Sequence, residues 1–151
     1  MPAARSRKAR LGAALAFSRA DASFSAAIRG LLARAELRGL VDQGMGPILF
    51  TLEQRGVLTM SELAATASIP RSTMTGIAAR MQQRGLIRTA PNPRDGRGTV
   101  VALAPKGRTV LPRLHRIERD LDDAICGVIP TKDRAELVVL LLKLAAAFST
   151  L

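Results

Sequence analysis

Apolar residues recur at steps of three and four along most of this chain, and this spacing predicts helices. Six helices are expected, at about 14–38, 47–55, 60–67, 71–84, 105–126 and 133–147. Two short apolar runs, 86–90 and 99–103, predict strands, and the segment PNPRDGRG between them has the composition of a loop. With 151 residues, the chain is expected to form one mainly α (α+β) domain with a two-stranded β-wing.

Local signals set several of the predicted helix boundaries. Thr59 and Glu62, three residues apart, match a capping box that opens the third helix. Gly85 is expected to end the fourth helix in the left-handed conformation that glycine adopts at low cost. Pro112 lies within the fifth helical pattern, where it is expected either to bend the helix or to mark its true start.

The sixth predicted helix contains the run LVVLLLKLAAAF, which is apolar on every side. A helix on the surface of a single chain normally keeps one polar face. We therefore expect this helix to be buried between chains as well as within one, and the protein to be an obligate homodimer.

The positive charge of the chain is concentrated in two segments. Residues 1–10 carry four basic and no acidic residues, and residues 70–108 carry eight basic residues and one acidic residue, which together account for the net charge of +11. Such an excess favours a polyanionic partner. Aromatic residues make up only 3% of the chain, with no Tyr or Trp, so a surface that stacks on single-stranded bases is not expected. The composition therefore favours a polyanionic partner that is not bound by base stacking.

The order of the elements, helix, short turn, helix and basic hairpin, is that of a winged helix-turn-helix. An α-helix fits the major groove of DNA, where short polar side chains reach base edges and phosphates. The apolar stripe from Met74 to Met81 faces inward, so the recognition helix 71–84 presents its other side to DNA. Arginines of the wing 91–98 suit the narrow minor groove, with Asp95 near enough to orient Arg97. The candidate DNA-binding residues are Arg71, Ser72, Thr73, Thr75, Arg80, Arg94, Asp95 and Arg97.

Residues 46–107 resemble the MarR-type transcriptional regulators. The resemblance rests on the segment SELAATASIPRSTMTGIAARMQQRGLI, on the wing motif Asp95-Gly96-Arg97 and on the segment VVALAPKG. It implies a dimeric DNA-binding repressor or activator, whose first, fifth and sixth helices build the dimer interface. It also implies that Arg97 enters the minor groove, braced by Asp95. In many members a small-molecule effector binds between the dimerisation and DNA-binding parts and releases DNA.

Three departures from the family pattern bear on the site. Gly76 stands where the recognition helix often has a larger polar or basic residue. The wing has Asp-Gly-Arg in place of the usual Asp-Arg-Arg, and Ala104-Pro105 lacks the threonine that commonly precedes the fifth helix. Since the chain has no Tyr or Trp, any pocket for an effector is expected to be aliphatic.

These predictions divide the chain into regions. Residues 1–10 are expected to be a disordered basic tail, residues 11–40 and 109–151 a helical dimerisation region, and residues 41–108 the winged helix-turn-helix region. The expected function is a dimeric, sequence-specific transcriptional regulator that acts on a pseudo-palindromic DNA site. Repression is the favoured direction of regulation. The alternative is a winged-helix module for nonspecific, architectural DNA binding or for protein–protein contacts.

No enzymatic function is predicted. Ser72 and Thr73 have no general base near them in the sequence. His115 and Cys126, the single residues of their types, lack the spacing of a metal site, and we interpret them as a face residue of the fifth helix and a structural thiol. No cofactor, metal or membrane partner is expected, and with one cysteine and no long apolar run the protein is expected to be cytoplasmic.

Overall fold

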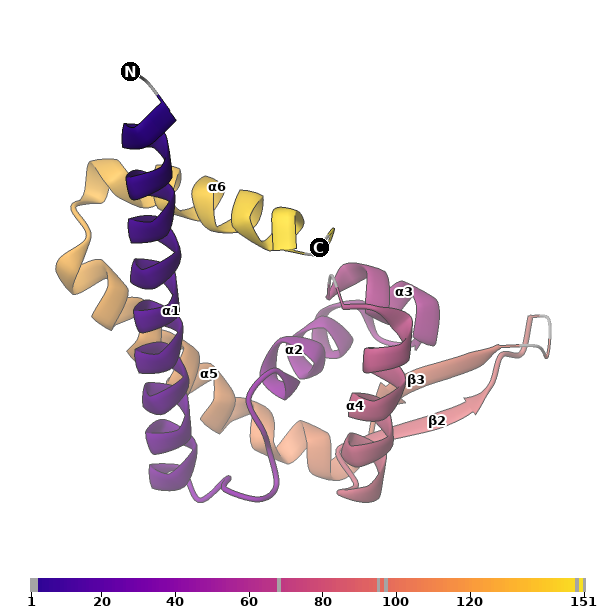
Figure 1. Ribbon diagram of the computed structural model, residues 1–151. Coiled ribbons are helices and arrows are strands. Elements are labelled where there is room, and N and C mark those ends of the chain that lie inside the picture. The colour runs from indigo at the N-terminus through magenta and orange to yellow at the C-terminus, as the bar shows by residue number, and fades with distance from the viewer. Residues whose placement is uncertain (1–2, 68, 95, 97, 149, 151) are drawn as a thin grey trace.

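The computed structural model describes residues 3–67, 69–94, 96, 98–148 and 150, with side chains from residue 12 onward. The six predicted helices and the hairpin are confirmed (Figure 1). The elements follow in the order α1 (Ala3–Arg34), α2 (Met45–Arg55), β1 (Leu58–Thr59), α3 (Met60–Thr66), α4 (Arg71–Gln83), β2 (Ile87–Pro91), β3 (Thr99–Leu103), α5 (Pro105–Val128) and α6 (Thr131–Phe148).

The sheet contains a third strand that the sequence pattern did not predict. Its strand order is β1-β3-β2, and both neighbours of β3 run antiparallel to it. Strand β1 has only two residues, too few to show alternation, and its second residue, Thr59, also caps α3. The hairpin of β2 and β3 projects away from the helices and forms the wing (Figure 1).

Helix α1 begins and ends earlier than the apolar pattern predicts. It starts at Ala3, so the backbone of residues 3–10 is helical and does not form the disordered tail that we expected. Ala, Arg and Lys are good helix formers, a property that apolar periodicity does not register. The helix ends at Arg34 because the chain turns at Glu36, which has a φ of 56°, and buries Leu37. The Leu37 N–H then donates to the Leu32 carbonyl at 2.8 Å.

The local boundary signals are confirmed at α3 and α4. The Thr59 hydroxyl accepts a hydrogen bond from the Glu62 N–H at 3.1 Å, and the Glu62 carboxylate accepts one from the Thr59 N–H at 2.7 Å. Gly85 follows α4 with a φ of 74°. Helix α5 begins at Pro105, so Pro112 lies inside the helix and does not mark its start.

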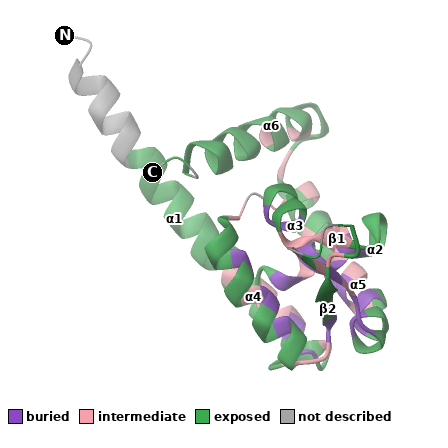
Figure 2. Ribbon diagram, turned by 90° about the vertical axis from the view of Figure 1, so that its right-hand side faces the viewer, coloured by how far each residue is buried: buried purple, intermediate pink, exposed green. Residues whose placement is uncertain are grey.

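The hydrophobic core lies within the winged helix-turn-helix region and the adjoining parts of α1 and α5. Its buried residues run from Leu32 in α1 to Ile117 in α5. In contrast, α6 has no buried residue in the single chain, and Figure 2 shows this helix and much of α1 exposed. In the part of the chain that the structure describes, no helix is both long and apolar enough to span a membrane.

A close approach of two backbone segments joins the base of the wing to α5. The Ala104 N–H donates to the Leu86 carbonyl at 3.0 Å, just before α5 begins. Gly107, in the first turn of α5, lies against the same carbonyl, and a Cβ atom at this position would overlap the Leu86 oxygen. The lack of a side chain at Gly107 therefore allows the segment after α4 to meet the start of α5.

Candidate nucleic-acid interface

The outer side of α4 carries the residues predicted to read DNA. Met74, Ala78 and Met81 of this helix are buried, which fixes the rotation of the helix about its own axis. The polar and basic side chains then point to solvent. The exposed ones are Arg71, Ser72, Thr73, Thr75 and Arg80. The structure therefore presents all five on the exposed side of one helix.

The middle of this surface offers few hydrogen-bond donors. The Thr75 hydroxyl donates to the Arg71 carbonyl at 2.9 Å, so its lone pairs and methyl group are what remain for a base. Gly76 has no side chain, and open space surrounds it. The donors of α4 are therefore concentrated toward its two ends, where Arg71 and Arg80 lie.

The wing tip is closed by hydrogen bonds around Asn92. Its N–H donates to the Gly98 carbonyl at 2.8 Å, and its own carbonyl accepts from the Gly96 N–H at 2.8 Å. Its side-chain oxygen accepts from the Arg94 N–H at 3.1 Å, an Asx-type contact that orders a loop. Arg94 is exposed on this loop. Asp95 and Arg97 lie outside the described residues, so their roles stay predictions.

The charge of Arg94 reaches the first turn of α3. Backbone and side-chain hydrogen bonds from Thr59 are the main causes that lower the pKa of Glu62, and the positive charges of Arg94 and Arg55 lower it further. The positive charge of the wing loop thus favours the ionised form of a carboxylate in the first turn of α3.

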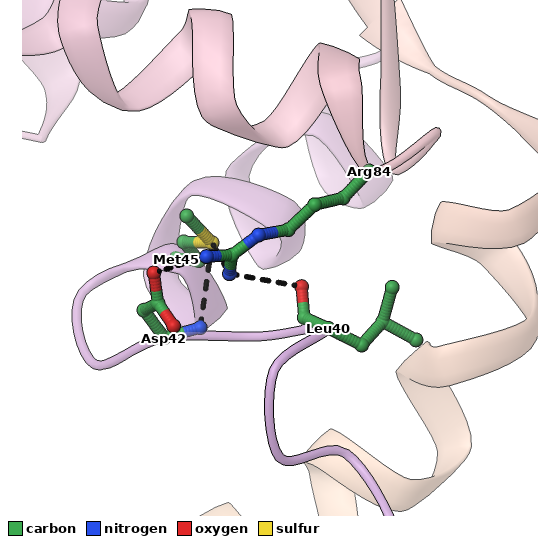
Figure 3. A network of polar contacts seen from close by, with 4 residues as sticks. All are labelled: Leu40, Asp42, Met45 and Arg84. Atoms are coloured by element: carbon green, nitrogen blue, oxygen red, sulfur yellow. Dashed lines mark hydrogen bonds and ion pairs between the residues drawn. The ribbon is translucent and has the colours of Figure 1, made fainter.

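The C-terminal end of α4 is held by contacts that sequence analysis did not predict. Arg84 Nη2 forms an ion pair with Asp42 Oδ2 at 2.8 Å, and its Nη1 donates to the Leu40 carbonyl at 3.3 Å (Figure 3). On the sheet side, the Thr89 hydroxyl donates to Gln82 Oε1 at 3.0 Å. In the sequence analysis, Arg84 contributed only to the positive charge of residues 70–108. Its contact with Leu40 was not predicted, because no local pattern links residues 44 positions apart.

An open cleft of about 570 Å³ lies between α1, α2 and α5. Its lining is mainly apolar and includes residues of the loop between α1 and α2. Representative lining residues are Phe24, Ile28, Val41, Gln43, Phe50 and Leu121. The rings of Phe24 and Phe50 contribute to the lining, so this cleft is not purely aliphatic.

His115 of α5 bridges to α2 beside this cleft. Its Nε2 lies 2.7 Å from a Glu53 carboxylate oxygen and its Nδ1 lies 3.3 Å from that of Glu118, while the ring stacks on Phe50 with 4.5 Å between centroids. A ring with a carboxylate at each nitrogen is bound best as the imidazolium, which donates at both. The hydrogen bond to Glu53, supported by Glu118 and opposed by partial burial, raises the pKa of His115. His115 thus joins α5 to α2. Its interpretation as a face residue of the fifth helix did not predict this contact.

These contacts predict a pH-dependent contribution to stability. When folding raises the pKa of a group, the group stabilises the fold fully at pH values below its pKa in the unfolded chain, which is about 6.5 for histidine. This contribution is lost as the pH rises through the raised pKa of the folded state. The loss of unfolding free energy caused by His115→Gln is therefore expected to be larger at about pH 5.5 than at about pH 8.5. Urea unfolding at both pH values measures it. Arg116→Gln, which removes a neighbouring exposed basic residue, is the control. A loss caused by His115→Gln that grows toward alkaline pH would contradict the assignment.

Cys126 lies partly buried near the end of α5. Arg134 of α6 donates to its carbonyl oxygen at 2.8 Å and to the Ile129 carbonyl at 3.0 Å, which fixes the turn between the two helices. Within the described residues, no three His, Cys, Asp or Glu side chains are grouped so as to hold a metal ion.

Comparison with known proteins identifies the chain's relatives. The model of the MarR family matches residues 46–98, from α2 to the wing. The HTH-type transcriptional repressor IacR of Pseudomonas putida is 36% identical over 74 residues, which cover 49% of this chain and 44% of that protein. The chain therefore spans less than half of the length of this relative.

A second relative is matched over a larger share of its length. The multiple antibiotic resistance protein MarR of Salmonella typhimurium is 30% identical over 98 residues, which cover 64% of this chain and 68% of that protein. A crystal structure of mutant MarR from Escherichia coli, complexed with operator DNA, has the same fold, with a TM-score of 0.74 at 20% identity over 87% of this chain and 91% of that one. From the identity with the Salmonella protein and from this fold, we conclude that the chain belongs to the MarR family of transcriptional regulators.

Proposed function

We propose that this protein is a dimeric transcriptional repressor that binds a specific DNA site, with α4 in the major groove and the wing in the minor groove. The exposed side of α4 carries the proposal, because Arg71 and Arg80 flank short polar side chains there. Arginines contact phosphates or guanine, and Ser72 and Thr73 have the length to reach base edges. Arg94 adds positive charge on the adjoining wing, where Asp95 and Arg97 are the predicted minor-groove pair. Repression is supported by the likeness to IacR, which is named a repressor.

A second copy of the chain completes the proposed DNA-binding unit. Exposed apolar side chains in the single chain include Leu15, Phe17 and Phe24 of α1 and Val138, Leu140, Leu142 and Phe148 of α6. Phe17 and Phe148 meet edge to face with 5.1 Å between ring centroids, so the apolar surfaces of the two helices adjoin. Clustered exposed apolar side chains are typical of a subunit interface. All of α6 and most of α1 lie in residues 11–40 and 109–151, the proposed dimerisation region.

The cleft between α1, α2 and α5 is the proposed site for a small-molecule effector. It lies where α1 and α5 meet α2, the first helix of the winged helix-turn-helix region, residues 41–108. Its apolar lining, with Phe24 and Phe50, suits a small aromatic or apolar molecule, and the side chains of Gln43 and Gln54 provide polar groups that orient one.

Selection from random DNA, followed by footprinting, tests the proposed function. We expect protection of one discrete, two-fold symmetrical site, with half-sites about one helical turn apart. The logarithm of the affinity should fall linearly with the logarithm of salt concentration, with a slope of about −0.9 for each phosphate contact. Arg80→Gln should make this slope shallower by about 2 in a dimer, since each protomer loses one contact.

The matched control for this experiment is Arg119→Gln, which removes an exposed arginine of α5 outside the proposed DNA surface and should leave the slope unchanged. Uniform coating of the DNA would contradict specific binding and favour an architectural role. Absence of any DNA binding by the wild type would favour a surface for protein–protein contacts.

A further inference from the structure

The loop between α1 and α2 holds the C-terminal end of α4 through a single side chain. Two groups of this loop and one of α2 surround the Arg84 guanidinium: the Asp42 carboxylate at 2.8 Å, the Leu40 carbonyl at 3.3 Å and, at the start of α2, the Met45 sulfur at 3.8 Å. Figure 3 shows the guanidinium among them. Only 26% of the Arg84 side chain is exposed. The guanidinium is thus engaged with protein groups, unlike the exposed arginines of α4.

The loop that Arg84 contacts is itself fixed to the core. Leu37, Val41 and Met45 are buried on either side of Asp42. The Val41 N–H donates to the Leu37 carbonyl at 2.9 Å, and the Met45 N–H donates to the Asp42 carbonyl at 3.1 Å. Asp42 therefore sits on a short, internally bonded turn. Because this turn continues directly into α2, a contact to it sets the position of α4 relative to the helices of the scaffold.

A small change at this end of α4 is amplified at the other. The helix has 13 residues, and at 1.5 Å per residue it is about 20 Å long. A tilt of about 5° around the Arg84 end moves Arg71, at the opposite end, by about 2 Å. Such a displacement exceeds the range of distances that a hydrogen bond to a base tolerates. A change in the geometry at Arg84 would therefore shift the point at which the N-terminal side chains of α4 meet DNA.

We propose that Arg84 is a positioning residue of the DNA interface, which fixes the angle of α4 against the α1–α2 loop and does not itself contact DNA. The inference rests on the proposed binding of DNA by α4. For a substitution that neutralises Asp42, the proposal predicts a change in DNA affinity opposite to the one expected from charge alone. Removal of a negative charge near a basic surface raises DNA affinity where charge alone acts, whereas loss of the Arg84 contact lowers affinity for the specific site.

The test compares Arg84→Met, Asp42→Asn and the double variant on the duplex that the wild type selects from random DNA. Each single variant is expected to bind this duplex about tenfold more weakly. The double variant should be no weaker than Arg84→Met, since both substitutions remove the same contact. The salt dependence of specific binding should be unchanged, because no phosphate contact is lost, and affinity for a random-sequence duplex of equal length should change by much less than tenfold. Asp120→Asn, which neutralises an exposed acid of α5, is the control for charge.

Three results would overturn the positioning role. They are stronger binding by Asp42→Asn, an additive loss of about 100-fold in the double variant, and a shallower salt slope for Arg84→Met, which would make Arg84 a phosphate contact. Thermal unfolding without DNA identifies a temperature at which all variants are folded, and binding is compared there. A wild type that selects no duplex would instead refute DNA binding itself, so the two failures are distinguishable.

Discussion

A glutamate at position 142 is expected to convert the proposed dimer to a monomer. The Leu142 side chain is 65% exposed in the single chain, so Leu142→Glu should change the stability of the isolated fold only slightly. In a two-fold dimer the residue occurs twice, and burial of each leucine against a partner contributes about 1.5–3 kcal/mol. Loss of both contacts, with two carboxylates brought to the interface, is expected to raise the dimer dissociation constant by at least about 100-fold.

Analytical ultracentrifugation measures this change directly. Affinity for the selected DNA duplex should fall with it, because a monomer reaches only one half-site. Lys143→Glu is the matched control, since it alters the charge of α6 more than Leu142→Glu does and leaves the apolar side chains in place. A Leu142→Glu protein that remains a dimer with unchanged dissociation constant would exclude this part of α6 from the interface.

Alanine at position 107 is expected to destabilise the fold by about 3 kcal/mol or more. The added methyl group would overlap the Leu86 carbonyl oxygen. Because this oxygen belongs to the backbone, it cannot rotate away as the end of a side chain can, and α5 must move relative to the base of the wing. For a chain of this size the loss corresponds to a decrease of about 10 °C in melting temperature.

The same substitution at Gly76 is the matched control and is expected to have the opposite sign. Gly76 lies inside α4 and is exposed, with open space where the methyl group would go. Alanine is favoured over glycine by about 0.5–1 kcal/mol in such a position. Thermal unfolding of Gly107→Ala and Gly76→Ala without DNA measures both effects. A higher melting temperature for both variants would contradict the close contact at Gly107.

The features that sequence analysis predicted correctly are encoded over a few neighbouring residues. The Thr59–Glu62 capping box, the glycine after α4 and the buried stripe from Met74 to Met81 all depend on spacings of three or four residues, which a helix makes adjacent. The resemblance of residues 46–107 to the MarR family is likewise confirmed, by the family match over residues 46–98.

The features that it missed join residues far apart in the chain. Arg84 contacts Leu40 across 44 positions, His115 contacts Glu53 across 62, and strand β1 forms because Leu58 meets Val101. No local pattern requires these pairings, because they follow from how the helices pack. The early start of α1 was missed for another reason: a helix with high intrinsic propensity and no apolar stripe shows no periodicity.

The α1–α2 loop contacts two sites at once, and this has a thermodynamic consequence. Val41 and Gln43 line the cleft, while Asp42 between them is paired with Arg84. A molecule in the cleft and DNA on α4 therefore act on one short segment. If such a molecule weakens DNA binding by some factor, equilibrium linkage requires DNA to weaken the binding of that molecule by the same factor. Protein that is free of DNA would then be the more sensitive detector of the molecule, and protein already on its site the less sensitive one.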